Sequence, residues 1–209
     1  MRINISYFLF MIPYLISQDI TLLNFLRTFV DPNSVFQTRL IHIFSDIEVG
    51  IVMVVLIGLW LYGVYKKNNQ FKIEALMMLY SIGFAFLIYV ILNLGLPFRP
   101  RPETVSAIEP LIKHLPDNSF PSGHAIFAGS SILAGFLYTR WWIAWVLLIT
   151  GIMMIFSRVL AGIHYPGDIL VGFIIWLIGA LMVYTWRDTK FMKKMLLVYP
   201  VKMAKIFKL

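Results

Sequence analysis

The chain has 209 residues, of which 60% are hydrophobic and 13% charged, and its formal net charge at pH 7 is +8. A soluble domain is nearer half apolar and a quarter charged, so this composition and the mean hydropathy of +0.81 exclude an ordinary soluble fold. The chain has no cysteine, which excludes disulfides and thiolate metal sites. With no internal repeat visible, residues 1–209 are predicted to form a single all-α domain, a polytopic bundle of membrane helices.

The first apolar run, INISYFLFMIPYLI at 3–16, is short for a membrane span and contains Pro13. A helix needs about 20 residues to cross the hydrocarbon core of a bilayer. We expect a sixth span or an interfacial helix here. A cleaved signal peptide is the alternative, with Arg2 as its positive n-region, but no small-residue cleavage site follows.

The next segment, 17–46, mixes apolar residues with charges that break any membrane pattern. Its stretches 20–30 and 34–44 are typical of short amphipathic helices that lie on a membrane surface. We therefore predict that 17–46 is partly interfacial. A simple connector is the alternative.

Five later runs are long and apolar enough to be clear spans of the ~30 Å hydrocarbon core. They cover 48–65, 73–92, 121–139, 141–157 and 168–186. The sequence therefore predicts five spans, with the N-terminal run as a sixth.

Lysine and arginine in short loops favour the cytoplasmic side of a membrane. The first two clear spans are joined by 66–72, which holds three lysines, and Arg140 lies between the third and the fourth. The last span is followed by a lysine-rich tail at 188–209. Counting crossings, all three positions lie on one face, which we expect to be the cytoplasmic face of an inner (cytoplasmic) membrane.

The end of this tail, KFMKKMLLVYPVKMAKIFKL, alternates lysines with apolar residues and is typical of a helix lying on anionic lipid. The same lysines also fit a plain topology signal. Either explanation accounts for the net positive charge, so no nucleic-acid partner is predicted.

Three polar stretches fall on the opposite face, towards the periplasm or exterior: FRPRPE at 98–103, FPSGH at 120–124 and SRVLAGIHYPGD at 157–168. Charged residues at a membrane edge are costly and are functional by default. One such residue would mean little, but alternating spans deliver three groups to one face. This grouping predicts a functional site.

The second stretch has the features of an anion site. Pro121 suits the first position of a helix. The N–H groups of Ser122 and Gly123 would then point outward, unpaired, at the positive end of the helix dipole. We expect them to bind an anion.

The third stretch repeats this design, because Pro166 opens the last helix, with His164 just before it and Asp168 in its first turn. The carboxylate can reach one ring nitrogen of His164, which would fix the tautomer and leave the other nitrogen free as a nucleophile. A structural hydrogen bond is one alternative and half a metal site is another. The metal site lacks a third strong ligand with suitable spacing, so no metal and no cofactor are predicted.

Two arginines of these stretches, Arg101 and Arg158, present planar forks that suit phosphate oxygens. A membrane-edge arginine taken alone commonly snorkels towards the headgroups instead. His42 and His114 are predicted to be structural or surface residues.

At these residues the sequence resembles the type 2 phosphatidic acid phosphatase family of membrane lipid phosphatases. The family pattern is Lys-x6-Arg-Pro, then Pro-Ser-Gly-His, then Ser-Arg-x5-His-x3-Asp. The second and third motifs match in full at 121–124 and 157–168, and the first matches at Arg101 and the proline after it. The first-motif lysine is absent, because Leu94 stands seven residues before Arg101. Arg99 is the candidate to replace this lysine in part.

This resemblance implies a metal-independent phosphatase with a six-span helical fold, acting on a lipid phosphate in the membrane. His164 would attack phosphorus and form a phosphohistidine, Asp168 would orient His164, and His124 would protonate the leaving oxygen. The phosphoryl oxygens would be held by Arg101, Arg158, Ser122 and Gly123.

Three functions remain open from the sequence. The first is hydrolysis, at the outer face, of a lipid phosphate or diphosphate such as undecaprenyl diphosphate, phosphatidylglycerol phosphate, phosphatidate or lipid A. The second is transfer of the phosphoryl group to another lipid through the same histidine. The third is a non-catalytic lipid-binding protein, suggested by the missing lysine. The intact histidines and aspartate favour an enzyme, and the constant supply of water at an outer-face site favours hydrolysis.

Overall fold

The computed structural model describes residues 17–96, 98–105, 108–113 and 117–206. Helices dominate these ranges and no strand occurs within them, which confirms the all-α prediction. After a helix at 17–27, the helices in chain order are α2 (Val35–Phe44), α3 (Ile47–Tyr65), α4 (Asn69–Gly95), α5 (Pro102–Val105), α6 (Gly123–Tyr138), α7 (Trp141–Leu160), α8 (Pro166–Trp186), a π-helical segment η1 (Met192–Val198) and α9 (Tyr199–Ile206).

Five of these helices coincide with the five predicted spans. α4, α7 and α8 are each long and apolar enough to cross a membrane, as is α3 taken together with α2. α6 is also apolar but only 16 residues long. The described helices therefore form a multi-pass membrane bundle, whereas the predicted sixth span at 3–16 lies outside the described residues.

Two short helices precede the first of these spans. The predicted stretches 20–30 and 34–44 correspond to the helix at 17–27 and to α2. α2 exposes Val35 and Phe36, as expected of a helix whose apolar side meets lipid. The place of these helices on a membrane surface stays a prediction.

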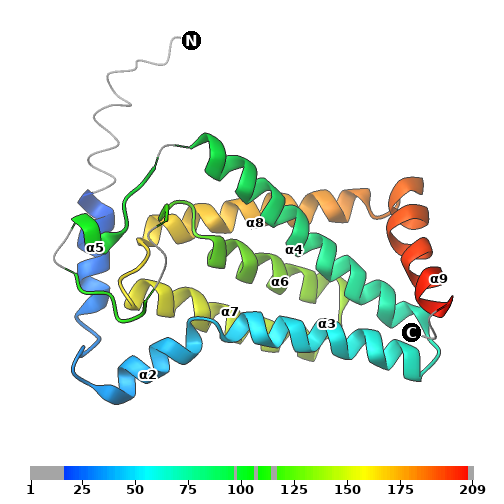
Figure 1. Cartoon of the computed structure of the whole chain (residues 1–209), viewed down its shortest axis with the longest axis horizontal. Helices are drawn as coiled ribbons and strands as arrows, with labels where there is room; N and C mark the ends of the chain where they lie inside the picture. Colours follow the sequence, from blue (N-terminus) through cyan, green and yellow to red (C-terminus); the bar gives the residue numbers. More distant parts are fainter. Residues whose placement is uncertain (1–16, 97, 106–107, 114–116, 207–209) are drawn as a thin grey trace, which may run out of the picture.

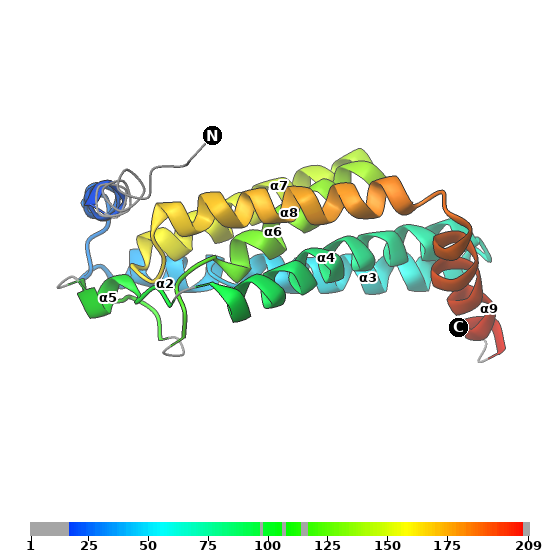
Figure 2. The same cartoon turned by 90° about the horizontal axis from the view of Figure 1, so that it is seen from above.

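α6 is the central helix of the bundle. Figure 2 shows α3 and α4 in one layer and α7 and α8 in another, with α6 between them. α6 packs against α4, α7 and α8. The start of α6, which carries the second polar stretch, is therefore surrounded by the other spans.

Close packing around α6 and α8 depends on glycine. A Cβ added to Gly129 of α6 would lie 2.0 Å from the Trp176 ring of α8, and one added to Gly179 of α8 would lie 2.7 Å from the Cα of Ala85 in α4. Small residues let helices approach closely in a membrane, where the hydrophobic effect does not drive them together. α4, α6 and α8 are held in close contact in this way.

The starts of α6 and α8 set the positions of the predicted site residues. α6 begins at Gly123 and not at Pro121 as predicted, because Ser122 is the N-cap and its Oγ accepts a hydrogen bond of 3.4 Å from the Ala125 N–H. α8 begins at Pro166, as predicted. The unpaired N–H groups of α6 therefore belong to residues later in the chain than expected.

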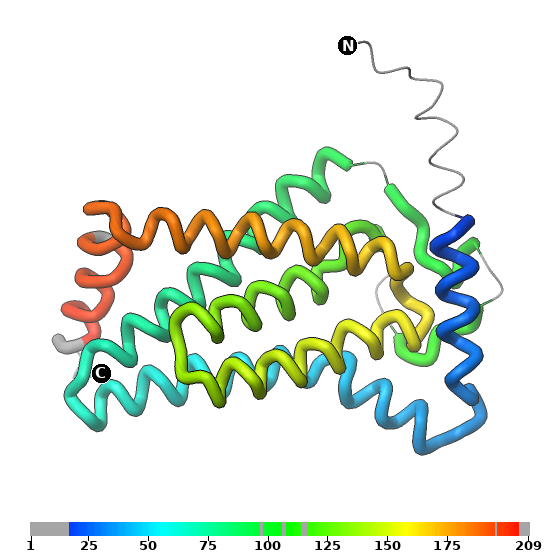
Figure 3. The backbone as a smooth tube through the Cα atoms, turned by 180° about the vertical axis from the view of Figure 1, so that it is seen from behind, coloured from blue at the N-terminus to red at the C-terminus, as the bar shows by residue number. Residues whose placement is uncertain are grey.

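The polar stretches and the lysine-rich segments lie at opposite ends of the bundle. In Figure 1 the connection from α4 to α6, which includes α5, and the turn from α7 to α8 lie at the end where α2 is found, and α9 lies at the other end. Figure 3 shows from behind that the helix at 17–27 lies across the first of these ends. The order of the spans separates the two ends as the sequence predicts, whereas the side of the membrane that each end faces stays a prediction.

Candidate active site

The three polar stretches meet at one end of the bundle (Figure 1). Arg101 comes from the connection between α4 and α6, His124 from the first turn of α6 and Arg158 from the last turn of α7. His164 lies in the turn between α7 and α8, and Asp168 in the first turn of α8. All of these side chains except that of His124 are buried, which is rare for charged groups unless they are paired. Their partners therefore define the site.

His164 is held through its Nδ1 atom. This atom lies 3.0 Å from the backbone carbonyl of Ser119 and 3.5 Å from Oδ2 of Asp168. Because a carbonyl only accepts, we assign the proton to Nδ1 and the lone pair to Nε2. No hydrogen-bond partner of Nε2 occurs among the residues that the structure describes. This tautomer leaves Nε2 available as a nucleophile.

Burial lowers the pKa of His164 below its ordinary value, because it penalises the charged imidazolium. The Asp168 carboxylate opposes this shift of the pKa, and the positive charges of Arg101 and Arg158 reinforce it. The ring is therefore neutral near pH 7, as a nitrogen nucleophile requires.

Asp168 is fully buried, and both of its oxygens have partners. Oδ2 accepts hydrogen bonds from the Tyr165 N–H at 3.0 Å and from the Ser119 hydroxyl at 2.5 Å. Oδ1 accepts from Nη1 of Arg99 at 2.6 Å. The expected contact with His164 is present but long, and Nδ1 of the imidazole donates its shorter hydrogen bond to the Ser119 carbonyl. Sequence reasoning missed Ser119, because a backbone carbonyl leaves no signal in a sequence.

Arg158 joins His124 to the start of α3. Its Nη2 lies 2.5 Å from Nε2 of His124 and 2.5 Å from Oδ1 of Asp46, and its Nε donates to the Ser45 carbonyl at 3.1 Å. A guanidinium only donates, so Nε2 of His124 accepts and carries no proton in this arrangement. Asp46 was not predicted as a site residue. Its carboxylate lies 3.5 Å from Nε2 of His124 and also pairs with Arg158. A bound anion would compete with it for these two groups.

Arg101 fixes the turn that carries His164. Its Nη1 donates to the carbonyl of Ile163 at 2.6 Å, and its Nε and Nη2 donate to Oδ1 of Asp117 at 3.0 and 2.5 Å. The Asp117 side chain is 56% exposed, whereas that of Arg101 is 9% exposed. The guanidinium is therefore fixed on its buried side and pairs with a solvent-exposed carboxylate on its open side.

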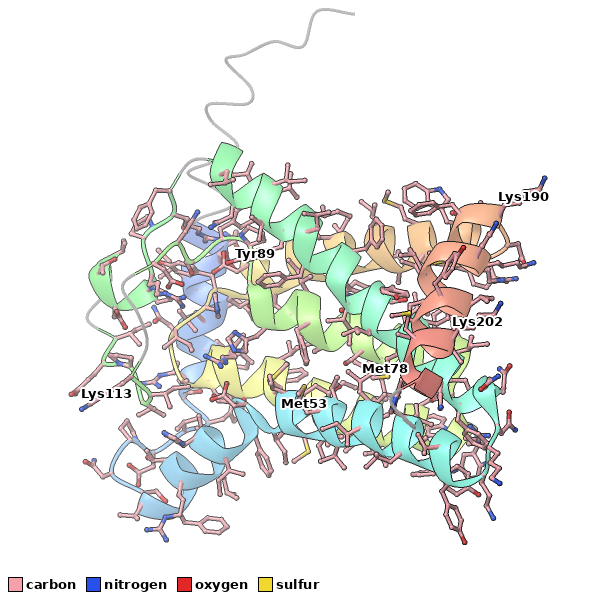
Figure 4. The ribbon with its side chains drawn as sticks, turned by 45° about the vertical axis from the view of Figure 1, so that its right-hand side comes forward. Met53, Met78, Tyr89, Lys113, Lys190 and Lys202 are labelled. Atoms are coloured by element: carbon pink, nitrogen blue, oxygen red, sulfur yellow. The ribbon has the colours of Figure 1, made fainter. Side chains whose placement is uncertain are left out.

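The anion site predicted at the start of α6 differs in detail. The N–H of Ser122 donates to the backbone carbonyl of Asp168 at 3.2 Å, so it does not point outward as expected. The N–H groups of Gly123 and His124 have no acceptor within the described part of the chain. Tyr89 borders them, since a Cβ on Gly123 would lie 3.5 Å from the Tyr89 ring, and Figure 4 shows Tyr89 on α4 towards this end. The orphan donors are thus shifted by one residue from their predicted place.

The missing lysine has no direct replacement at its own position. The Leu94 side chain is 84% exposed near the end of α4. Arg99, the predicted substitute, uses both terminal nitrogens for carboxylates: Nη1 lies 2.6 Å from Asp168 and Nη2 lies 2.6 Å from Asp19. The phosphate-binding role of Arg99 stays a prediction, and its observed partners are acidic.

The structure describes one of the two remaining histidines. His42 is exposed in the last turn of α2, and His114 lies outside the described residues. In the described ranges, no group of three or more histidine, aspartate or glutamate side chains is placed to hold a metal ion. The site is thus built from imidazole, guanidinium and carboxylate groups.

Known proteins resemble the chain in sequence and in fold. It is 27% identical over 156 residues to undecaprenyl-diphosphatase BcrC of Bacillus subtilis (strain 168), which covers 75% of this chain and 77% of that protein. It is 31% identical over 150 residues to bacitracin transport permease protein BcrC of Bacillus licheniformis, which covers 68% and 70%. The crystal structure of Aquifex aeolicus LpxE superposes with a TM-score of 0.64 at 20% identity, over 79% of this chain and 93% of that one. At that identity the structural likeness shows the fold alone.

The comparison with protein families covers the polar stretches directly. Residues 74–192 match the family described as the PAP2 superfamily. This region is more than half of the chain and contains all three stretches at the end of the bundle. The chain therefore belongs to the PAP2 superfamily.

Proposed function

We propose that the chain is a hydrolase that removes phosphate from a lipid diphosphate or a lipid monophosphate through a phosphohistidine on His164. Its relatives indicate a phosphatase, and its apolar helices indicate a multi-pass membrane protein. The observation that carries the proposal is the hydrogen bond from Nδ1 of His164 to the Ser119 carbonyl, because it presents Nε2 as an unprotonated nucleophile.

In the first step Nε2 of His164 attacks phosphorus, so that a P–N bond forms and the bond from phosphorus to the leaving oxygen breaks. His124 donates the proton that the leaving oxygen needs. In the structure Nε2 of His124 accepts from Arg158 instead. Arg158 therefore has to leave His124 and bind the phosphate oxygens before Nε2 of His124 can carry a proton. Substrate binding thus makes His124 available as the general acid.

In the second step water attacks the phosphohistidine. His124, now neutral, takes a proton from this water, the P–N bond breaks, and inorganic phosphate leaves with His164 neutral again. Asp168 stabilises the positive charge that develops on the His164 ring. Neither step requires a metal ion, because arginines and helix N–H groups supply the positive charge that phosphoryl transfer needs.

The proposed phosphate ligands are Arg101, Arg158 and the N–H groups of the first turn of α6. Ser122 contributes by capping this turn, and Gly123 contributes its N–H and lets an anion approach closely. The two carboxylates that pair with the arginines in the structure are 56% and 65% exposed. Because these carboxylates face solvent while the arginines are buried, a carboxylate can turn away into water and leave its arginine to a multiply charged phosphate.

Undecaprenyl diphosphate is the substrate that we propose first. A relative over 75% of the chain is named undecaprenyl-diphosphatase, which supports a polyprenyl diphosphate. Phosphatidylglycerol phosphate, phosphatidate and lipid A offer the same phosphate chemistry on other lipids and complete the panel to be tested.

We further propose that the end carrying His164 faces the periplasm or exterior of an inner (cytoplasmic) membrane. Figure 4 places Lys190 and Lys202 at the end opposite Lys113, and the lysines of 66–72 join the same end as the tail. This asymmetry supports a cytoplasmic tail that lies against anionic lipid. The whole chain then acts as one domain in the bilayer.

The test is release of inorganic phosphate by the purified chain in detergent, with each lipid supplied alone and with His164→Ala as the inactive control. Substrate labelled in its terminal phosphate should leave label on the unaltered chain after an alkaline quench, since a P–N bond survives base and is lost in acid. No release from a single lipid, with label passing to a second lipid when one is added, would make the chain a phosphotransferase. Neither release nor transfer with any lipid would make it a lipid-binding protein.

A further inference from the structure

We propose that Arg99 and Asp19 form a pair that positions Asp168 and, through Asp168, also His164. In this role Arg99 does not bind the phosphate of the substrate. This inference rests on the proposed function, because it concerns the same histidine. Asp19 belongs to the helix at 17–27, which lies outside the matched family region at 74–192. The N-terminal helix is thereby part of the support of the site.

Arg99 lies between two carboxylates. Its Nη1 is 2.6 Å from Oδ1 of Asp168, and its Nη2 is 2.6 Å from Oδ2 of Asp19. Its guanidinium carbon lies 4.0 Å from the centre of the Tyr165 ring, so the ring covers one face of the guanidinium. The side chain is only 20% exposed. With both terminal nitrogens and one face occupied, Arg99 is fixed beside Asp168.

Asp19 ties this arginine to the start of α8. Its Oδ1 accepts a hydrogen bond of 2.7 Å from the Gly167 N–H, while its Oδ2 accepts from Arg99. A carboxylate at the N-terminus of a helix is favoured by the helix dipole. A Cβ on Gly167 would lie 2.6 Å from Oδ2 of Asp19, so the missing side chain makes this approach possible.

The helix at 17–27 is packed firmly enough to place Asp19. Leu23, one turn later, is fully buried in a cluster with residues of α7 and of the turn that follows it. Arg27, at the end of the helix, donates to two backbone carbonyls at 2.7 and 3.0 Å, the first of them at the end of α7. These contacts anchor the helix independently of Asp19.

Asp168 needs a positive partner because its carboxylate is completely buried. Within the described ranges, Arg99 is the one cationic side chain that hydrogen-bonds to this carboxylate. His164 therefore lies in the field of a carboxylate that Arg99 partly neutralises. Removing Arg99 leaves the full negative charge beside the imidazole, which raises the proton affinity of His164 and reduces the neutral, nucleophilic fraction.

The test compares Arg99→Ala, Arg99→Lys and Asp19→Asn with the unaltered chain in detergent. Arg27→Ala is the matched control, because it removes an arginine that anchors the same helix but changes no charge in contact with Asp168. For each protein the measurements are kcat and KM for a lipid diphosphate, the pH profile of kcat/KM, and the inhibition constant of inorganic phosphate.

We expect Arg99→Ala to lower kcat by about 10- to 100-fold, by analogy with the loss seen when the hydrogen-bond partner of a metal-binding histidine or carboxylate is removed. The inhibition constant of inorganic phosphate should stay unchanged. The acid limb of kcat/KM should move to higher pH, because Asp168 regains its full negative charge beside His164. The other charged or titratable groups near His164 are unchanged in this variant: Arg101, Arg158, His124 and Asp168.

The other variants separate the effect of the Arg99 charge from that of its geometry. Arg99→Lys should recover part of kcat, because it restores the charge without the fork. Asp19→Asn should lower kcat by less and should not move the acid limb upward, since Arg99 and its charge remain. Arg27→Ala should leave the acid limb in place. If Arg99→Ala does not fold, Arg99→Lys and Asp19→Asn still test the inference, because each should lower kcat while the inhibition constant of inorganic phosphate stays unchanged.

A phosphate ligand would behave differently. If Arg99→Ala raised KM and the inhibition constant of phosphate while kcat and the acid limb stayed unchanged, or if Leu94→Lys restored its activity, Arg99 would bind phosphate and the inference would be wrong. It would also be wrong if Arg27→Ala moved the limb as Arg99→Ala does. Absence of phosphate release by the unaltered chain overturns the proposed function, whereas release with an unaffected Arg99→Ala overturns this inference alone.

Discussion

Nη2 of Arg158 lies 2.5 Å from Nε2 of His124, so a proposed phosphate ligand and the proposed general acid bind each other directly. Asp46 approaches the same pair, with Oδ1 at 2.5 Å from Nη2 of Arg158. Arg158 thus donates hydrogen bonds to both His124 and Asp46. In the proposed mechanism a phosphate enters this cluster by displacing the carboxylate of Asp46.

Asp46→Asn should therefore tighten the binding of phosphate. The substitution removes a negative charge that competes for Arg158, and a unit charge at about 4 Å acts through water with ~1 kcal/mol, or about a fivefold effect. The measurement is the inhibition constant of inorganic phosphate, with Asp31→Asn, a change at an exposed aspartate before α2, as the control. Weaker binding in Asp46→Asn would show instead that Asp46 holds Arg158 in its working position.

The acid limb of kcat/KM should have its midpoint below about 6.5, the ordinary pKa of imidazole. Burial lowers the pKa of His164, so the neutral nucleophile persists as the pH falls through that value and is lost only at lower pH. The measurement is the pH profile of kcat/KM with one lipid diphosphate. Asp168→Asn should move the limb further down, because it removes the charge that opposes burial. A midpoint above about 6.5 in the unaltered chain would mean that the carboxylate outweighs burial.

Turnover should survive chelation by EDTA. The proposed mechanism draws its positive charge from Arg101, Arg158 and the N-terminus of α6, all of which EDTA leaves in place. The measurement is phosphate release before and after EDTA, with a magnesium-dependent phosphatase treated in parallel to show that chelation was complete. A loss of activity that magnesium restores would contradict the mechanism.

A cysteine at the site end should react with an impermeant thiol reagent in intact cells. The chain has no cysteine of its own, so Lys113→Cys creates a unique target on an exposed residue. Lys190→Cys, at the opposite end in Figure 4, is the matched control and should react only after lysis. The reverse pattern would invert the proposed orientation.

The bundle was predictable from the sequence because lipid imposes a simple rule, a run of about 20 apolar residues for each crossing. The exact start of α6 was not, because both Pro121 and Ser122 suit the beginning of a helix. The hydrogen bond from the Ala125 N–H to Oγ of Ser122 decides between them, and it depends on backbone geometry.

The site was predictable only where the partners lie close in sequence. His164 and Asp168 stand four residues apart at a helix start, and the spacing alone brings them near each other. Asp46 is 112 residues from Arg158, and Asp19 is 148 residues from Gly167. Such pairs are set by tertiary packing, and nothing in the local sequence marks either aspartate as part of the site.

α6 is too short to cross a bilayer core by itself. Its 16 residues extend about 24 Å and the 27 residues of α4 about 40 Å, whereas the hydrocarbon core is ~30 Å thick. In Figure 1 α4 and α6 reach about the same level at the end that carries the site, whereas α4 extends well past α6 at the end where α9 lies. The turn from α6 to α7 therefore lies alongside α4 and short of its other end, so the polar groups of this turn need partners within the protein. Such partners are present: the Thr139 hydroxyl donates to the Gly135 carbonyl at 2.8 Å, and Nη1 of Arg140 pairs with Oε2 of Glu74 at 2.5 Å.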